Sequence, residues 1–302
     1  MLDRRMELLR VLDRVGTITG AAELLYRSPS GYSRQLSSLA DELGVQLLEQ
    51  HGREVRLTAA ARRLVSYADE VKTSWLRTRA SLTEESDGGG RLRIGAIPTS
   101  LSRLVVPLLG DLSAAHPLLS IRLSEVDAPR CFDQLIADQL DACLVPARAG
   151  VPPQSDRRFH QRSVIVEPID ALVPPEHPAA GRPGISLKTL AEDRWVLPGD
   201  ERSGHEEILS ACHAAGFTPQ VQHYAQDTQA VSDLVAATGA VSLTSRFATY
   251  RSLAVRVPLT GSPQPGRQLL LCTAAGAENT AALGTLVELI RLRTPVTDLG
   301  ED

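Results

Sequence analysis

The stretch from Gly16 to Thr58 constrains the fold of this chain more than any other part. It reads GTITGAAELLYRSPSGYSRQLSSLADELGVQLLEQHGREVRLT. A first helix is predicted from Thr19 to Leu25, and residues 26–27 form a short connection. Ser28 is a good N-cap, and Pro29 suits the first helical position because its missing N–H costs nothing there. A second helix therefore runs from Pro29 to about Glu42, and Gly44 ends it.

The second helix has two different faces. Its apolar side chains recur at spacings of four, three and four and predict a buried stripe of Tyr32, Leu36, Leu39 and Leu43. Ser30, Ser33 and Arg34 fall on other sides. Small hydroxyl side chains allow close approach to bases and phosphates, and Arg34 adds charge and a bidentate donor. On composition alone, an ordinary solvated serine-rich face explains this helix equally well.

The residues after this helix favour the DNA-binding alternative. Residues 47–58 are typical of a β-hairpin with His51-Gly52 near its turn, and Arg53 and Arg56 flank that turn. A helix-turn-helix followed by a basic wing is a DNA-docking unit, with its helix in the major groove and its wing beside it. The residues predicted to contact double-stranded DNA are Ser28, Pro29, Ser30, Ser33, Arg34, Arg53 and Arg56.

The same stretch resembles the N-terminal signature of LysR-type transcriptional regulators. The matching blocks, with matching gaps, are Ala21-Ala22, Ser28-Pro29-Ser30-Gly31, Ser33-Arg34-Gln35, Leu39-Ala40-Asp41-Glu42-Leu43-Gly44, Leu47-Leu48-Glu49-Gln50 and Leu57-Thr58. Two positions depart from the family. Gln50 stands where Arg is common, which removes a phosphate contact, and Gly31 stands where Ala is common, which costs the helix about 1 kcal/mol. The resemblance implies a mainly α winged helix-turn-helix domain over residues 1–58.

A long linker helix is predicted next, from residue 59 to about 84, with Thr58 as its cap. Its apolar positions recur mostly at intervals of three and four and include Leu64, Val71 and Trp75. Such a stripe needs a partner, which is either the helix's own wing or the same helix of a second subunit. The resemblance implies a dimer helix over residues 59–87, with dimers able to assemble into tetramers. Residues 88–90, three glycines, are predicted to form a hinge.

Composition narrows the functional class. The 302-residue chain has a net charge of −4, so DNA binding must depend on local clusters of Arg. An amphipathic, charged helix follows Met1, and no apolar run could span a bilayer; we therefore expect a cytoplasmic protein without a signal peptide or membrane partner. The cysteines have no CxxC spacing and are expected to be small buried hydrophobes, with redox sensing by Cys131 or Cys143 as the alternative.

From Leu92 onward, strands and helices alternate. The order βαβαβ over residues 92–145 predicts a mostly parallel sheet, a long crossover strand follows at 163–173, and a second set of strands and helices fills 195–243. Residues 267–274 return as a strand before a final helix. Leu140-Asp141-Ala142 and the turn at 174–179 resemble LysR motifs. The resemblance implies an α/β effector domain shaped like a periplasmic binding protein over 91–302, with lobe I at about 91–162 and 263–295 and lobe II at about 163–262.

Ligands of open α/β sheets bind beyond the carboxyl ends of strands, near helix N-termini. The candidate effector-binding residues at such places are Thr99, Ser100, Asp127, Arg148, Arg202, Ser203 and Thr228. Hydroxyls, helix N–H groups and Arg suit an anionic effector such as a carboxylate. The simpler explanations are N-capping for the hydroxyl residues and a solvated surface position for Arg148 and Arg202. Asp127 stands where the family often has Ser or Thr, and either caps its helix or recognises a hydroxyl or amine.

These patterns predict a sequence-specific DNA-binding transcriptional regulator that responds to a small effector in the cleft between the lobes. One alternative keeps DNA binding and leaves only oligomerisation to the lobes. An enzyme is the other, but His205, His213 and His223 lack the HExxH spacing of zinc hydrolases. No catalytic residue, metal or cofactor is predicted.

Overall fold

The structure is a computed structural model that describes residues 3–51, 54–85, 90–148, 150–199 and 204–293. The chain divides into two units. Unit 1 comprises residues 1–145, 151–162 and 270–293, and unit 2 comprises 146–150, 163–269 and 294–302. Within the described ranges, no helix combines the length and the apolar composition needed to cross a membrane.

Unit 1 begins with the predicted winged helix-turn-helix. Its elements are α1 (Arg4–Val15), α2 (Ile18–Leu24), α3 (Pro29–Leu43), β1 (Leu48–His51), β2 (Glu54–Leu57) and α4 (Ala59–Glu85). The predicted caps are confirmed: Ser28 Oγ accepts from the N–H of Gly31 at 3.2 Å, and Thr58 Oγ1 accepts from the N–H of Ala61 at 3.1 Å. Gly44 ends α3 with a φ of +64°, a conformation that favours glycine.

The predicted apolar stripe of α3 is buried only in part. Tyr32, Leu36 and Leu39 are buried in the core, but Leu43 is 42% exposed, so its predicted burial is wrong. Leu43 is the last residue of α3, and the chain turns away at Gly44. Leu47, which follows this turn, is buried instead at 1% exposure.

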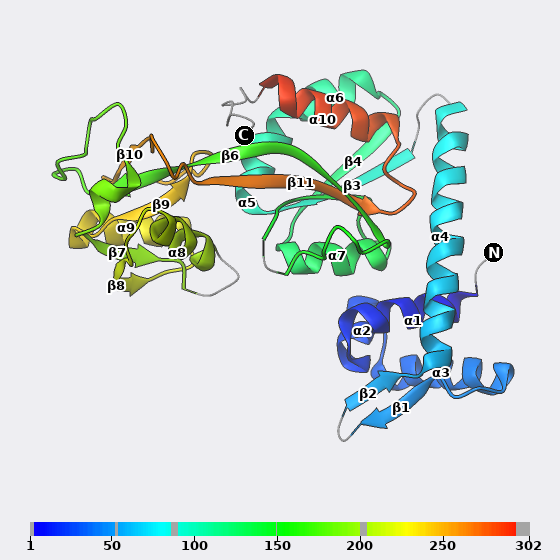
Figure 1. Cartoon of the computed structure of the whole chain (residues 1–302). Helices are drawn as coiled ribbons and strands as arrows, with labels where there is room; N and C mark the ends of the chain where they lie inside the picture. The colour runs from blue at the N-terminus through cyan, green and yellow to red at the C-terminus, as the bar shows by residue number, and fades with distance from the viewer. Residues whose placement is uncertain (1–2, 52–53, 86–89, 149, 200–203, 294–302) are drawn as a thin grey trace. The chain divides into compact units, whose positions relative to one another are not determined.

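Lobe I follows within unit 1. Its strands are β3 (Gly90–Ala96), β4 (Leu119–Glu125) and β5 (Ala142–Pro146), and β3 pairs with both neighbours in parallel, as predicted. The helical segment after β3 consists of α5 (Pro98–Ser100), a π-helical turn (Leu101–Val105), a 3₁₀ turn (Val106–Leu108) and α6 (Leu109–Ala115). Figure 1 shows α6 and α10 (Ala281–Arg293) together on one side of the strands, and α7 (Ala128–Ile136) on the other.

The start of lobe I corrects the predicted hinge at 88–90. Gly88 and Gly89 lie outside the described residues, whereas Gly90 belongs to β3 and pairs with Leu119 of β4. α7 begins at Ala128, because Asp127 caps it.

Unit 2 has its own core and sheet. Its elements are most of β6 (Phe159–Val173), β7 (Arg194–Leu197), α8 (His205–Ala214), β8 (Gln220–Tyr224), α9 (Thr228–Thr238), β9 (Ser242–Ser245), β10 (Val255–Val257) and the first part of β11 (Gly266–Ala274). β6 pairs antiparallel with β9 and β10, and β7 pairs in parallel with β8. Trp195, Leu197 and Cys212 are completely buried in this core. The strands β6 and β11 contribute residues to both units.

Candidate nucleic-acid interface and effector site

The N-terminal end of α3 is accessible to a partner. Ser28, Pro29, Ser30 and Arg34 are exposed, and Ser33 is half-buried. Gly31 allows the chain to close tightly here, since a Cβ at this position would lie 2.9 Å from the capping Oγ of Ser28. The structure therefore brings five of the predicted DNA-contacting residues together on one helix end.

The opposite side of α3 is held rigidly. The hydroxyl of Tyr32 donates to the backbone carbonyl of Leu8 in α1, and the Tyr32 side chain is completely buried. Burial raises the pKa of Tyr32 above its ordinary value, so the phenol stays a donor. Because α3 cannot rotate without losing this bond, the orientation of its exposed end is fixed relative to α1.

The turn before α3 holds a candidate that sequence reasoning treated only as a connection. Tyr26 is 91% exposed and has a φ of +54°, which is uncommon for a residue other than glycine. The next residue, Arg27, donates from Nη1 to the side-chain oxygen of Gln35 at 3.0 Å. An aromatic hydroxyl at the front of a helix-turn-helix can donate to a phosphate. The signal in the sequence was a large amphipathic residue in a two-residue turn.

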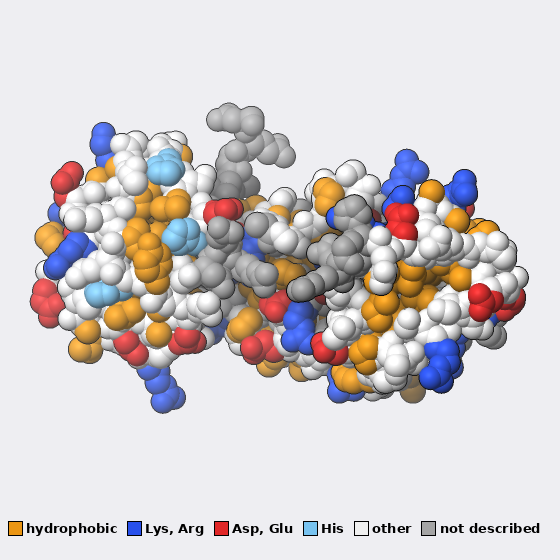
Figure 2. Space-filling model, turned by 90° about the horizontal axis from the view of Figure 1, so that it is seen from below, with side chains coloured by type: hydrophobic (Ala, Val, Ile, Leu, Met, Phe, Trp, Pro, Cys, Tyr) orange, Lys and Arg blue, Asp and Glu red, His pale blue; other side chains and the backbone are white. Residues whose placement is uncertain are grey.

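The wing presents one of its two predicted arginines within the described residues. Arg56 is exposed on β2 and lies opposite Glu49 of β1 in the hairpin register. Arg53 lies outside the described residues. At the base of the wing, Arg62 donates from Nη1 to the carbonyl of Leu57 at 2.6 Å, which ties α4 to β2. Figure 2 shows, at its right, basic side chains around hydrophobic ones on the face that carries this domain.

In lobe I, three predicted effector residues follow strand ends. Ser100 is 1% exposed, and among the described residues its Oγ has no hydrogen-bond partner. Thr99 beside it is half-buried. Asp127 is exposed and accepts from the N–H of Arg130 at 2.9 Å, so it is the N-cap of α7. The buried hydroxyl of Ser100 is thus the strongest candidate for a polar contact to a ligand.

Unit 2 holds the remaining effector candidates. Arg148 follows β5 and is half-buried, as is Thr228. Asp227, rather than Thr228, caps α9 by accepting from the N–H of Ala230 at 3.0 Å. Arg202 and Ser203 lie outside the described residues. The structure therefore removes the capping explanation for Thr228.

A buried charged cluster on β6 was not predicted. Glu167 is completely buried; it accepts from Nε of Arg267 at 2.8 Å and from the hydroxyl of Ser245. Burial raises the pKa of Glu167, and Arg267 opposes that rise. Asp170, also buried, accepts from Nε of Arg246 at 3.0 Å. The local sequence around Glu167 and Asp170 is typical of a strand and does not indicate their partners. Arg246 lies 76 residues from Asp170, and Arg267 lies 100 residues from Glu167.

All four cysteines are buried, as predicted. Burial raises the pKa of the Cys212 thiol to about 12. Burial, together with the neighbouring thiols Cys131 and Cys272, raises the pKa of Cys143 well above its ordinary value. The reactive thiolate is therefore disfavoured at Cys143 and Cys212.

One histidine of unit 2, His205, forms contacts of a structural kind. His205 stacks on Tyr224 with ring centroids 5.9 Å apart, and its Nδ1 lies 3.0 Å from the carbonyl oxygen of Pro198. Figure 2 shows, at its left, His side chains among hydrophobic ones on this unit. Within the part of the chain that the structure describes, no three His, Cys, Asp or Glu side chains are arranged to hold a metal ion.

Comparison with known families agrees with this geometry at both ends of the chain. The model of the LysR substrate binding domain matches residues 85–294, and that of the bacterial regulatory helix-turn-helix protein, lysR family, matches residues 4–62. The chain belongs to the LysR family. It is a LysR-type DNA-binding transcriptional regulator with a C-terminal effector-binding domain.

Similar family members carry several functions in their names. A probable hydrogen peroxide-inducible genes activator of Streptomyces viridosporus is 29% identical over 282 residues, covering 90% of this chain and 87% of that protein. OxyR of Escherichia coli, a DNA-binding transcriptional dual regulator, is 27% identical, covering 96% of this chain and 95% of that protein. The RuBisCO operon transcriptional regulator of Allochromatium vinosum is 29% identical over a shorter alignment, covering 68% and 66%.

Solved structures share the fold of this LysR-family chain. A full-length OxyR variant from Pseudomonas aeruginosa has a TM-score of 0.65 at 21% identity, covering 97% of this chain and 95% of that one. Full-length BenM has a TM-score of 0.57 at 22% identity, covering 97% and 96%.

Proposed function

We propose that residues 1–58 read operator DNA, that 59–87 form the dimer helix, and that 91–302 bind the effector. The exposed end of α3 enters the major groove, and Arg56 of the wing lies near the backbone. The observation that carries this proposal is the accessible edge of Ser28, Ser30 and Arg34 on a helix whose other face is locked by Tyr32.

Fluorescence anisotropy with the DNA upstream of the chain's own gene tests the α3 edge. Arg34→Ala should weaken binding and reduce the dependence of log K on log salt by about one unit, because one phosphate or base contact is lost. Arg122→Ala, which removes an equal charge from an exposed position of β4 in lobe I, is the matched control. Equal effects of the two substitutions would contradict the proposal, as would the absence of specific binding by the unaltered chain.

The second part of the proposal concerns the signal. We infer that a small anionic molecule, such as a carboxylate, binds at the carboxyl ends of the lobe I strands. Ser100 supports this, because its buried hydroxyl has no hydrogen-bond partner among the described residues, and such a polar group is costly unless a ligand supplies a partner. In unit 2, Arg148 and Thr228 remain candidate effector contacts of that unit.

A thermal-shift screen against small carboxylates and amino acids tests this effector proposal. A ligand should raise the unfolding midpoint, and Ser100→Ala should reduce that rise. Ser102→Ala is the matched control, since Ser102 is exposed and its hydroxyl donates to the carbonyl of Pro98 at 2.8 Å. If no compound shifts the midpoint while DNA binding is intact, the alternative function is favoured, in which the lobes only assemble subunits.

The name of one relative refers to hydrogen peroxide, but we do not propose a thiol-based peroxide signal for this chain. All four thiols are buried, and the raised pKa values of Cys143 and Cys212 disfavour the thiolate that attacks peroxide.

Self-association through α4 completes the proposal. α4 buries Ala61, Val65 and Ala68 against its own domain, while Tyr67, Trp75 and Leu82 are each more than half exposed. These three residues share one side of the helix with Leu64 and Val71, which are both half-buried, and Leu64 also packs against the buried apolar cluster. This exposed stripe suits a second copy of α4, and assembly of such dimers into tetramers stays a prediction.

A further inference from the structure

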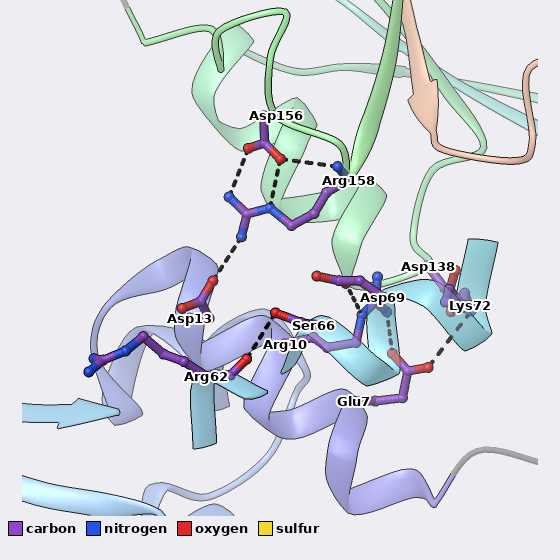
Figure 3. A network of polar contacts seen from close by, with 10 residues as sticks. All are labelled: Glu7, Arg10, Asp13, Arg62, Ser66, Asp69, Lys72, Asp138, Asp156 and Arg158. Carbon is purple, nitrogen blue, oxygen red and sulfur yellow. Dashed lines mark hydrogen bonds and ion pairs between the residues drawn. The ribbon is translucent and has the colours of Figure 1, made fainter. Parts of the chain in front are cut away.

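The winged helix and lobe I of the same chain contact one another through opposite charges. Arg158, just before β6, donates from Nη1 to Oδ2 of Asp13 in α1 at 2.9 Å. The next residue of α1, Arg14, donates from Nε to Oδ1 of Asp133 in α7 at 2.7 Å. Figure 3 shows the first of these pairs within a larger polar network. Adjacent residues of α1 with opposite charges thus each find their complement in lobe I.

The Arg158 side chain is aimed at α1 by a neighbour. Asp156 accepts from Nε of Arg158 at 3.0 Å and from Nη2 at 2.8 Å, which leaves Nη1 for Asp13 (Figure 3). A guanidinium held in a bidentate pair loses little further freedom when it makes a third bond. Lobe I therefore presents a preoriented cation to α1.

The residues that follow α7 extend the contact to two further helices. Asp138 pairs with Nζ of Lys72 in α4, and Gln139 donates to the backbone carbonyl of Leu24 in α2. Lys72 also lies 4.0 Å from Glu7 of α1, which in turn pairs with Arg10 (Figure 3). We call the interdomain contacts of Asp13, Arg14, Lys72, Asp133, Asp138 and Arg158 the charged seam.

A close backbone contact accompanies the charged seam. Gly276, in the loop after β11, has a φ of +92°, and a Cβ there would lie 2.3 Å from the backbone oxygen of Thr73 in α4. Thr73 directly follows Lys72. The loop can approach α4 this closely only because residue 276 has no side chain.

The contact with α4 is limited in extent. A cavity of about 710 Å³ adjoins it, lined by Leu76 and Ala80 of α4, Leu92 of β3 and Leu283 of α10. The paired side chains of the charged seam are between 15% and 48% exposed, so salt screens them in part. The winged helix and lobe I also share an apolar cluster, to which Leu9 and Phe132 both belong. A change of charge acts on the ion pairs of the contact and leaves these apolar side chains unaltered.

The charged seam does not cover the proposed DNA-reading edge. Its residues in the winged helix lie on α1 and α4, with Leu24 on α2, whereas Ser28, Ser30 and Arg34 of α3 remain exposed. Lobe I therefore fixes the direction of α3 without masking it. In a dimer, two such helices must meet successive half-sites at a set spacing, so their direction matters most for binding both half-sites together.

We propose that the charged seam is a latch through which lobe I orients the winged helix, so that opening it weakens binding to a two-half-site operator and leaves single half-site binding intact. The DNA part of this inference rests on the proposed function. The latch itself is a contact within one chain and can be measured without DNA.

Charge reversal and charge exchange at one pair test the latch. Arg14→Asp and Asp133→Arg each place like charges together, whereas the double variant restores an opposite pair. Each single variant should increase hydrogen exchange in α1 and α7, and the double variant should return it toward the original rate. Glu70→Arg and Arg122→Asp are controls, because both residues are exposed and lie outside the charged seam.

Binding of the full chain is then measured on two duplexes from its upstream DNA, one with both half-sites and one with a single half-site. We expect each single variant to lose about tenfold affinity for the longer duplex only, and the double variant to recover it. Unchanged exchange in the single variants, no recovery in the double variant, or equal losses on both duplexes would overturn the latch. If the unaltered chain binds neither duplex, the proposed function fails, and hydrogen exchange alone decides the latch.

Discussion

Asp156 shows how one carboxylate can prepare a neighbouring cation for a distant partner. Burial by itself would favour its neutral form. Hydrogen bonds from the side chain and the backbone N–H of Arg158 outweigh burial and hold the pKa of Asp156 below its ordinary value of 3.8. At neutral pH the residue is therefore a fixed anion that positions Arg158 toward Asp13. Tyr32 also fixes the position of a neighbouring element, because its hydroxyl donates to the backbone of α1 and holds α3 there.

A pH dependence follows for Asp156. A carboxyl whose pKa is lowered on folding contributes stability that is present above its unfolded pKa of 3.8 and is lost as the pH falls through the folded value. Asp156→Asn should therefore lower stability by about 1 kcal/mol at pH 7, after allowance for solvent screening, and by progressively less as the pH falls below 3.8. Urea unfolding at a series of pH values from 7 to below 3.8 measures this difference.

Asp111→Asn provides the comparison for this pH experiment. Asp111 pairs with Arg293, but both side chains are more than 40% exposed. Such a surface pair contributes roughly 0–1 kcal/mol, so its loss should be small at each of these pH values. A constant difference between the unaltered chain and Asp156→Asn across this pH range would show that charge is not the cause.

At the scale of elements, α4 has two faces with different partners. One face packs on the winged helix and meets the loop after β11, and the other exposes Tyr67, Trp75 and Leu82. α4 therefore contacts both the winged helix and lobe I, and it is the helix that we propose contacts the second subunit. Its length of 27 residues follows from the local pattern, but the use of each face depends on what packs there.

Two glycines make opposite predictions about substitution by alanine. Gly276→Ala should destabilise the chain by at least 2 kcal/mol, because its Cβ would clash with the backbone of α4 and its positive φ would be strained. Gly284→Ala should instead stabilise it by about 0.5–1 kcal/mol, since position 284 lies within α10 and a Cβ there meets no atom within 4 Å. Thermal unfolding of both variants compares them directly.

Trp75→Glu tests the exposed face of α4. A charge in the proposed helix pair should convert dimers into monomers, because an unpaired carboxylate would be buried at the interface. Ser81→Glu introduces the same charge at an exposed position off the stripe and should leave assembly unchanged. Sedimentation velocity reports the mass of each variant. A Trp75→Glu chain that still forms dimers would contradict the assignment of this face.

At the scale of the whole molecule, the residues proposed to contact DNA are exposed, whereas the cysteine thiols are buried. Because the net charge is −4, we expect DNA affinity to come from local basic residues, such as the proposed contacts Arg34 and Arg56. The thiols, in contrast, lie inside both lobes. Burial of all four thiols disfavours a signal that acts by oxidation of an accessible cysteine.

Thiol reactivity is therefore expected to be low in the folded state. A thiol reagent such as dithionitrobenzoate should react with the native chain very slowly and with all four cysteines after unfolding in urea. Hydrogen peroxide should likewise leave DNA binding unchanged under conditions where the chain remains folded. Rapid labelling of even one native thiol, or a peroxide-dependent change in DNA binding, would contradict this expectation.

The winged helix was predictable because its signals are local. A cap at Ser28, Pro29 at the first helical position, Gly44 at the end and apolar spacing in between specify α3 within 17 residues. The alternating pattern from Leu92 similarly indicated the parallel strands β3, β4 and β5. The predicted burial of Leu43 failed because spacing alone does not tell where a helix extends past its neighbours.

By itself, the sequence determined the order of helices and strands and the family, and it indicated the helix end that we propose contacts DNA, because capping, periodicity and turn residues act over a few positions. Only the tertiary structure decided which charges meet. Arg14 lies 119 positions from Asp133, and Asp13 lies 145 positions from Arg158. No local pattern encodes such pairs, since each depends on how whole elements pack. The charged seam and the buried Glu167 cluster are therefore properties of the folded chain.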